Sequence, residues 1–293
     1  MKRKNVKSSA CFDIVCRIIL VVLAFAALFP FLLLVMSSIT DETILVQEGY
    51  KLWPSKFSLD AYRLIFKTST VFDAYKVTIF VTVAGTLLSL IFTAALAYAL
   101  CVKSFRLRNT ISMYVYFTML FSGGLVPTYL LISKYLNLSN TVWALILPAL
   151  ISPWNMFLMR NFFQEIPSSV IESAKLDGAS EVKILFNIIL PMSKPALATI
   201  GLFYALSYWN EWYRAMLYIS KEKLFPLQYL IMTINRNMDY ANTMAGQTTI
   251  DFALPTFTVR LATTVVTIGP IIFLYPFIQK YFVKGLNVGA VKG

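Results

Sequence analysis

The sequence has 293 residues, 58% of them hydrophobic and only 14% charged, with a formal net charge of +12. A soluble domain usually carries about 25% charged residues, so this composition indicates an integral membrane protein. The sequence contains no histidine, which excludes zinc-protease motifs and Ser-His-Asp triads. Lys and Arg are spread among loops and span ends, so we ascribe the positive charge to cytoplasmic loops and expect no nucleic-acid partner.

The chain opens with a basic segment, residues 1–17, followed by an apolar run at 18–36. The apolar region of a signal peptide has about 7 to 15 residues, so this longer run predicts a first membrane span with a cytoplasmic N-terminus. Further apolar runs occupy residues 76–102, 111–133, 141–163, 195–218 and 259–282. Since a span needs about 20 apolar residues, we expect an all-α fold with six transmembrane helices and both termini cytoplasmic.

Loop charge supports this topology. Lys103, Arg106 and Arg108 lie in the second loop, whereas Lys134 is alone in the third, which places the second loop inside and the third outside. The segments 37–75 and 219–258 then become external, and the loop 164–194 becomes cytoplasmic. The domains are a cytoplasmic segment 1–17, a permease domain 18–282 and a cytoplasmic tail 283–293. Cys11, Cys16 and Cys101 are expected to be free thiols near the cytoplasmic ends.

The loop 164–194 interrupts the apolar chain with helix-forming signals. Ser169 and Glu172 have the S-x-x-E spacing of a capping box and predict a helix start. Asp177-Gly178 is a turn pair, and glycine readily takes the left-handed conformation that ends a helix. Two short helices, hinged at Gly178, are therefore predicted.

The second of these helices should start at Ser180, whose side chain can cap it, and end at Pro191. Pro195 then opens the fifth span. Ala174 and Gly178 lie four residues apart, so we expect a face of small residues that another backbone or a groove can approach closely.

Within the loop, Glu172-Ser173-Ala174, Gly178 and Ile188-Ile189-Leu190-Pro191 resemble the cytoplasmic EAA loop of the membrane subunits of bacterial ATP-binding cassette importers. Only the middle alanine departs, to serine. The resemblance implies that the loop forms the coupling helix, which docks in a groove of a separate ATPase. The tail 279–293 is similar to the C-terminus of maltose-type carbohydrate permeases, where it reaches the ATPase dimer interface. The implied ATPase-coupling residues are Ser169, Glu172, Ser173, Ala174, Asp177, Gly178, Leu190, Pro191, Lys292 and Gly293.

The chain has no phosphate-binding G-x-x-x-x-G-K-[ST] loop, since Gly-Lys does not occur in it. We therefore expect no cofactor, metal site or catalytic residue on this chain, and MgATP on the partner ATPase subunits. Capping alone also explains Ser169, Glu172 and Gly178, but it explains the shape of the loop and not its partner.

The fifth span carries Tyr208-Trp209-Asn210-Glu211-Trp212, similar to the W-N-E-aromatic stretch of those sugar permeases. An acidic side chain inside a span normally faces the protein interior or a water-filled cavity. Aromatic side chains are suited to stacking on sugar rings, so these five residues and Asn155 are candidates for the substrate path. An interfacial aromatic belt, with Glu211 paired to Arg214, is the alternative.

The resemblance covers most of the chain. It implies a bacterial cytoplasmic-membrane permease that pairs with a second, distinct permease, two ATPase subunits and an extracytoplasmic solute-binding protein. The most similar subgroup serves complex acidic oligosaccharides such as alginate or pectin fragments. The external segments 37–75 and 219–258 would contact the binding protein. Two alternatives are an ion-coupled secondary transporter and a membrane-embedded enzyme, which would need charged ion-coupling groups or paired carboxylates in the spans.

Overall fold

The computed structural model describes residues 10–67, 69–245, 257–270 and 272. Over these residues the secondary structure is helical apart from one antiparallel β-bridge between Thr40 and Phe57, which agrees with the expected all-α class. The chain divides into two units, one of residues 1–68 and 234–268 and the other of residues 69–233 and 269–293.

The first unit is built from α1 and the short helices that follow it. Its elements are α1 (Ala10–Ser38), α2 (Glu42–Glu48), α3 (Asp60–Lys67), the end of α14 (Leu227–Ala245) and a helix over residues 257–270. The stretch Ile14–Ser38 of α1 is long and apolar enough to cross a membrane, and its apolar residues are largely exposed, whereas Ser37 and Ser38 at its end are buried. An exposed apolar helix of this kind is suited to contact with lipid.

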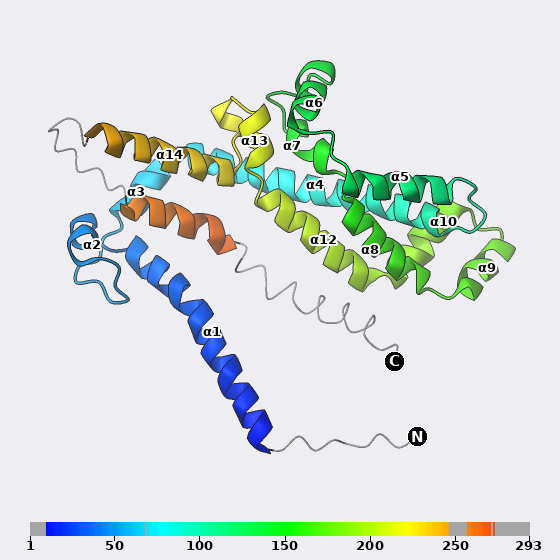
Figure 1. The fold of residues 1–293 in the computed structure, drawn as a ribbon, viewed down its shortest axis with the longest axis horizontal. Helices are drawn as coiled ribbons and strands as arrows, with labels where there is room; N and C mark the ends of the chain where they lie inside the picture. The colour runs from blue at the N-terminus through cyan, green and yellow to red at the C-terminus, as the bar shows by residue number, and fades with distance from the viewer. Residues whose placement is uncertain (1–9, 68, 246–256, 271, 273–293) are drawn as a thin grey trace. The chain divides into compact units, whose positions relative to one another are not determined.

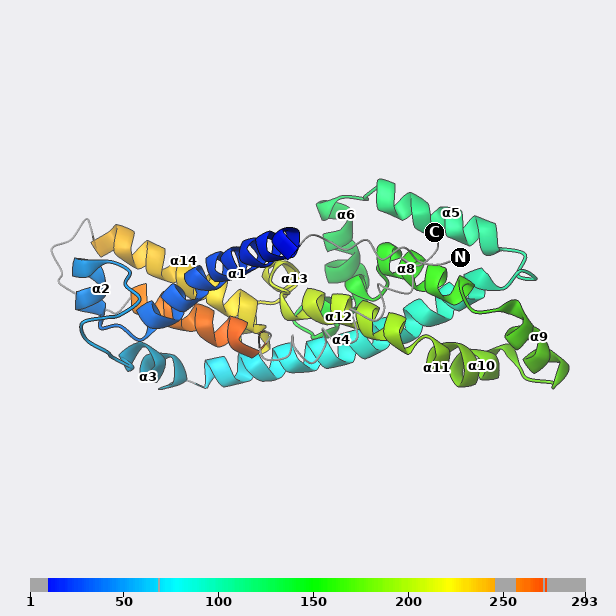
Figure 2. The same cartoon turned by 90° about the horizontal axis from the view of Figure 1, so that it is seen from below.

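The second unit is organised along α4 (Thr70–Cys101), which lies beside α8 and α12 (Figures 1 and 2). Its other elements, in chain order, are α5 (Arg108–Leu120), α6 (Leu125–Leu130), η1 (Leu131–Tyr135), α7 (Trp143–Ile146), η2 (Leu147–Ala149), α8 (Pro153–Gln164), α9 (Ser168–Leu176), α10 (Glu181–Ile184), η3 (Leu185–Ile189), α11 (Leu190–Met192), α12 (Lys194–Trp209), α13 (Tyr213–Tyr218) and η4 (Glu222–Leu224).

The predicted spans differ in how continuous they are. Among the described helices, Ile14–Ser38 and Thr70–Cys101 are long and apolar enough to cross a membrane without a break, as predicted for the first two spans. Two bent pairs also pass the same test, Arg108–Leu120 with Leu125–Tyr135 at 114° and Glu181–Met192 with Lys194–Trp209 at 87°.

The predicted spans at 111–133, 141–163 and 195–218 are not single unbroken helices. The first breaks at Gly123-Gly124, where Gly124 has a φ of +89°. The second is divided into short helices on either side of residues 150–152, and the third breaks at Asn210–Trp212. Glycine, proline and polar residues at these points weaken or interrupt backbone hydrogen bonding. The last predicted span is helical at 257–270 and 272, and its remainder lies outside the described residues.

Small residues let α4 and α12 approach closely. Gly85, Ser89 and Thr93 recur every four residues on α4 and face two tyrosines of α12. The hydroxyls of Ser89 and Tyr208 lie 2.9 Å apart, and those of Thr93 and Tyr204 lie 2.7 Å apart. These buried hydroxyl pairs hold the two helices in register, since a polar group between apolar helices is costly unless it is paired.

Gly85→Ala should weaken this packing. A Cβ atom at this position would lie 2.8 Å from the ring carbons of Tyr208, closer than real contacts allow. Overpacking of a close contact usually costs about 1–3 kcal/mol. Thermal unfolding of the purified protein in detergent measures the effect. Gly123→Ala is the control, because no atom lies within 4 Å of the added methyl; equal melting temperatures for the two variants would contradict the packing.

Candidate functional site

The segment predicted to couple with an ATPase begins at α9, but not through a capping box. The N-cap position is occupied by Pro167, and no side chain caps the helix. Because the helix starts at Ser168, directly after the proline, Ser169 already lies in the first turn. The predicted capping role of Ser169 and Glu172 was therefore wrong.

The predicted turn after α9 is confirmed. Asp177 is the C-cap and Gly178 follows with a φ of +75°, a conformation that favours glycine. The Ala179 N–H donates to the Ala174 carbonyl at 2.9 Å, so the turn supplies a hydrogen-bond donor to a carbonyl in the last turn of the helix. Ser180 then caps α10 by accepting a hydrogen bond from the Lys183 N–H at 3.4 Å, also as predicted.

The coupling segment exposes large apolar side chains rather than the expected small ones. Ala174 is buried in the core of its own chain, so it does not present a small-residue face. Leu176 is 89% exposed, the highest value for a large apolar side chain among the described residues, and Val182 and Phe186 are also exposed. Leu176 was not predicted from the sequence, although an apolar residue between Lys175 and Asp177 was the available signal.

A polar bridge joins the turn to the end of α4. The Lys175 ammonium lies 2.6 Å from one carboxylate oxygen of Glu181, and the buried Tyr98 hydroxyl donates to the other at 2.6 Å. The bridge therefore connects α9 and α10 to the longest helix of the unit.

The remaining coupling residues follow the turn. Ile184, Leu185 and Ile189 are buried and anchor the segment 181–192 in the core. Leu190 and Pro191 lie in α11, which ends at Met192 and not at Pro191 as expected, because the proline occupies the first turn. Pro195 lies in the first turn of α12, as predicted. Ser173 belongs to α9, and Lys292 and Gly293 lie outside the described residues.

The predicted path residues fall into a buried group and an exposed group. Tyr208 is 1% exposed and donates to the Ile146 carbonyl at 3.1 Å, and Trp209 is also buried. In this conformation both therefore pack inside the unit. Asn210 and Trp212 are exposed at the break between α12 and α13, where the Asn210 side-chain oxygen accepts from Gln228 at 3.2 Å.

Glu211 forms an ion pair with Arg214, the partner that the sequence analysis considered for it. The carboxylate is buried, with the residue 7% exposed, and it also accepts a hydrogen bond from the Arg214 backbone N–H at 2.6 Å. The Arg214 guanidinium lies over the Tyr208 ring, 5.9 Å from its centroid. Glu211 thus stabilises the start of α13 and neutralises a partly buried cation.

A groove of about 520 Å³ lies between the residues before α8 and one side of α12. Its polar lining includes Ser152, Asn155 and Ser207, and its aromatic lining includes Trp154 and Tyr204. Trp154 is 65% exposed, and the Tyr204 hydroxyl accepts a hydrogen bond from the Ser152 N–H at 2.9 Å. Aromatic faces beside amide and hydroxyl groups match the apolar faces and polar edges of sugar rings. Of the predicted residues only Asn155 lines this groove; the adjacent Trp154 was missed.

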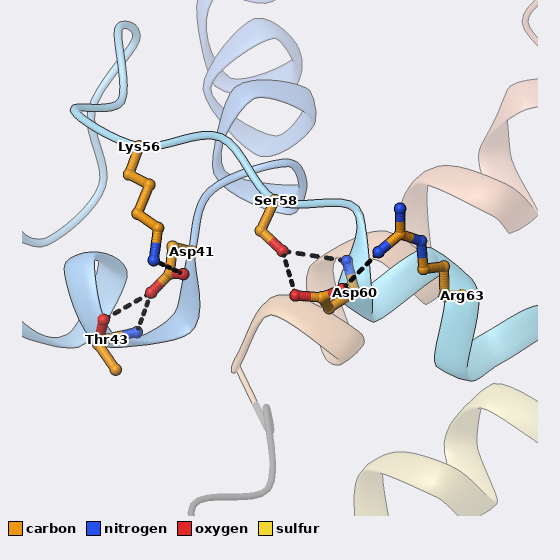
Figure 3. Close-up of polar contacts among 6 residues, drawn as sticks. All are labelled: Asp41, Thr43, Lys56, Ser58, Asp60 and Arg63. Carbon is orange, nitrogen blue, oxygen red and sulfur yellow. Dashed lines mark hydrogen bonds and ion pairs between the residues drawn. The ribbon is translucent and has the colours of Figure 1, made fainter.

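The segment between α1 and α3 carries a second cavity, of about 540 Å³, which has charged residues in its lining. In Figure 3, Asp41 lies between Lys56 and Thr43, and Asp60 lies between Ser58 and Arg63. The Lys56 ammonium and the Thr43 hydroxyl hold the pKa of Asp41 at about 2, below its ordinary 3.8. Because folding lowers this pKa, ionised Asp41 stabilises the folded protein above about pH 4, and this contribution is lost as the pH falls towards 2.

Comparison with known proteins gives consistent matches along the whole chain. The family described as "Binding-protein-dependent transport system inner membrane component" matches residues 12–288. Protein LplC of Bacillus subtilis is 40% identical, and the match covers 99% of this chain and 97% of the length of LplC. The polygalacturonan/rhamnogalacturonan transport system permease protein YtcP of Bacillus subtilis is 40% identical over 96% of this chain and 98% of its own.

A solved structure is similar over nearly the same extent. It is a chain in the crystal structure of a bacterial ABC transporter involved in the import of the acidic polysaccharide alginate. The two chains superpose with a TM-score of 0.81 at 32% identity, over 96% of this chain and 100% of that one. The similarity therefore extends to both sequence and fold.

Proposed function

Because the chain belongs to the family of binding-protein-dependent transport inner membrane components, a family of ABC transporter permease subunits and not enzymes, we propose that it is the permease of an ATP-driven oligosaccharide importer. The observation that carries this proposal is the exposed apolar surface of the coupling segment, centred on Leu176. An exposed apolar surface next to the hydrogen-bonded turn at Gly178 is suited to docking in a groove of a partner protein.

The partner at the coupling segment is an ATPase subunit that binds MgATP. Nucleotide-dependent movement of that subunit displaces α9 and the turn at Gly178. The Lys175–Glu181–Tyr98 bridge passes the displacement to α4. Alternating access then follows as a population shift, in which the nucleotide state supplies different affinities for two arrangements of the spans. Lys292 and Gly293 in the tail are assigned to the same interface.

The proposed membrane arrangement has six spans in the bacterial inner membrane, with both termini cytoplasmic. The bent pair Arg108–Leu120 with Leu125–Tyr135 contributes to one of them and Lys194–Trp209 to another, whereas Glu181–Met192, bent by 87° from Lys194–Trp209, belongs to the cytoplasmic loop. Broken helices occur at membrane depth where the exposed backbone is buried in protein or lines a cavity. A second, distinct permease subunit completes the pore, and a second ATPase completes the motor.

The external segment 37–75 is assigned to the solute-binding protein. It exposes Tyr50, Trp53 and Phe57 beside the ion pairs of Figure 3. Exposed aromatic side chains with a charged surround have the composition of a protein-binding surface. The segment 219–258 is the expected second contact.

Acidic oligosaccharides are the proposed substrate class. One relative is described as a polygalacturonan/rhamnogalacturonan transport permease, and the similar solved chain belongs to an alginate importer. In this chain the groove with Ser152, Trp154 and Asn155 is assigned to the substrate path. Asn210 and Trp212 extend the polar and aromatic character of the path at the end of α12, whereas Glu211 keeps its structural role.

Trp154→Ala should impair uptake of an oligogalacturonate without unfolding the protein. The indole is exposed in the groove, so its loss removes stacking on the sugar but leaves the core intact. Losing one such contact should raise the KM for uptake by about tenfold. Uptake of labelled oligogalacturonate into cells measures this effect. Trp143→Ala is the control, because Trp143 does not line the groove; equal KM values in the two variants would exclude the groove from the path.

A further inference from the structure

A pocket at the end of α4 is given no ligand in the function proposed above, although Tyr98 and Lys175 of its lining belong to the bridge with Glu181. The pocket has a volume of about 490 Å³ and is lined by residues of the α4–α5 loop, the end of α8 and α9. These segments lie at the same end of the second unit in both views (Figures 1 and 2). Its polar lining includes Lys103, Ser104, Arg108, Ser168, Glu172 and Lys175.

The charge of this lining is mainly positive. Three cationic side chains face one carboxylate, that of Glu172. Lys175 is paired with Glu181, whereas Lys103 and Arg108 form no ion pair with any residue that the structure describes. Two cations thus remain available to an anion in a pocket that hydroxyl groups also line.

A further cation lies behind the pocket wall. The Cys101 thiol, which lines the pocket, donates to the Arg160 carbonyl at 3.5 Å. The Arg160 guanidinium donates one long hydrogen bond, of 3.4 Å, to the Ser112 hydroxyl, and its Nε is buried without a hydrogen-bond partner among the described residues. A partly satisfied, half-buried guanidinium adds positive potential near this end of α8.

The rest of the lining is apolar. Val102, Phe163, Ile166 and Ile171 border the basic groups. A phospholipid with an anionic headgroup would match this lining, because its headgroup would face the basic residues and its acyl chains the apolar ones. In the proposed topology the α4–α5 loop lies at the cytoplasmic membrane surface, where basic pockets between spans bind anionic headgroups.

We propose that this pocket binds an anionic phosphate group, presented by a phospholipid headgroup or as free phosphate. Arg108 and Lys103 contact the phosphate oxygens, and Ser104 and Ser168 donate hydrogen bonds. An occupant would contact α9 directly, so its binding would bear on the position of the coupling segment. The placement at headgroup depth rests on the proposed topology, but the binding itself does not depend on transport.

Binding to the full-length chain, purified with its associated subunits in an uncharged detergent, tests the site. Calorimetric titration with dioctanoyl phosphatidylglycerol, dioctanoyl phosphatidylcholine and inorganic phosphate separates the sources. The phosphatidylglycerol should bind more tightly than the phosphatidylcholine, and Arg108→Gln or Lys103→Gln should each weaken its affinity by about fivefold. Lys134→Gln, an exposed lysine outside the pocket, should bind as the wild type does.

The outcomes distinguish the ligand and the proposal. Competition by inorganic phosphate, with the same dependence on Arg108, assigns the site to free phosphate, whereas binding of phosphatidylglycerol alone assigns it to lipid. The proposal is overturned when both glutamine variants bind as the wild type does. It is also overturned when the wild type binds neither phosphatidylglycerol nor inorganic phosphate. Lys103 is exposed, so its variant keeps the test valid should Arg108→Gln fold poorly. Neither result depends on whether the protein transports oligosaccharides.

Discussion

Leu176→Asp should leave the protein folded and strongly reduce the ATP hydrolysis that copurifies with it. The side chain is 89% exposed and contributes nothing to the core of its own chain. In the proposed complex it is buried in the ATPase groove, where a charge without a partner is costly. Loss of a central apolar contact costs about 2 kcal/mol or more, which corresponds to about thirtyfold in affinity.

The measurement is ATPase activity per mole of permease after purification in mild detergent, with the melting temperature as the folding check. Leu136→Asp is the matched control, because Leu136 is also an exposed leucine but lies in the third loop. Retention of full ATPase activity by Leu176→Asp would refute the assignment of this surface to the motor.

Glu211→Ala should destabilise the protein by about 3 kcal/mol, the lower end of the range for a buried pair, because it leaves the partly buried Arg214 guanidinium without its counter-ion. The Nε of Arg214 already has no hydrogen-bond partner among the described residues, so the remaining charge would be poorly satisfied. Thermal or denaturant unfolding in detergent measures the loss.

The double variant Glu211→Leu/Arg214→Met provides the control for this structural role. Replacing both ions by apolar side chains removes the unpaired charge, so most of the lost stability should return. If Glu211 instead lined the substrate path, the Glu211→Ala protein would keep its stability and lose uptake. The double variant would then not recover uptake. That pattern would show that Glu211 acts on the substrate rather than on α13.

Local signals predicted the coupling turn well. Gly178 and Ser180 were identified from residue types whose conformational preferences act over a few residues, and the positive φ and the Ser180 cap confirm them. Ser169 failed for an equally local reason, since Pro167 already fixes where α9 begins. A helix start was correctly predicted in this stretch, but Pro167 places it at Ser168 and not after Ser169.

Features that depend on packing were harder to predict. Hydropathy finds apolar runs but does not show that a helix ends at Leu120 or at Trp209 inside one, so the breaks in three predicted spans were not read from it. The sequence offered both a path role and a pairing role for Glu211, and only the fold places the carboxylate against Arg214. The groove beside Trp154 joins residues about 50 positions apart, and no local pattern links them.

The central claim is that a separate ATPase drives oligosaccharides through this permease, and reconstitution tests it most directly. The purified assembly in liposomes, supplied with its binding protein outside, ATP inside and no ion gradient, is assayed for accumulation of labelled oligogalacturonate. The account predicts uptake that requires internal ATP and is abolished by Leu176→Asp. Uptake without ATP, driven by an imposed ion gradient and unaffected by Leu176→Asp, would contradict it.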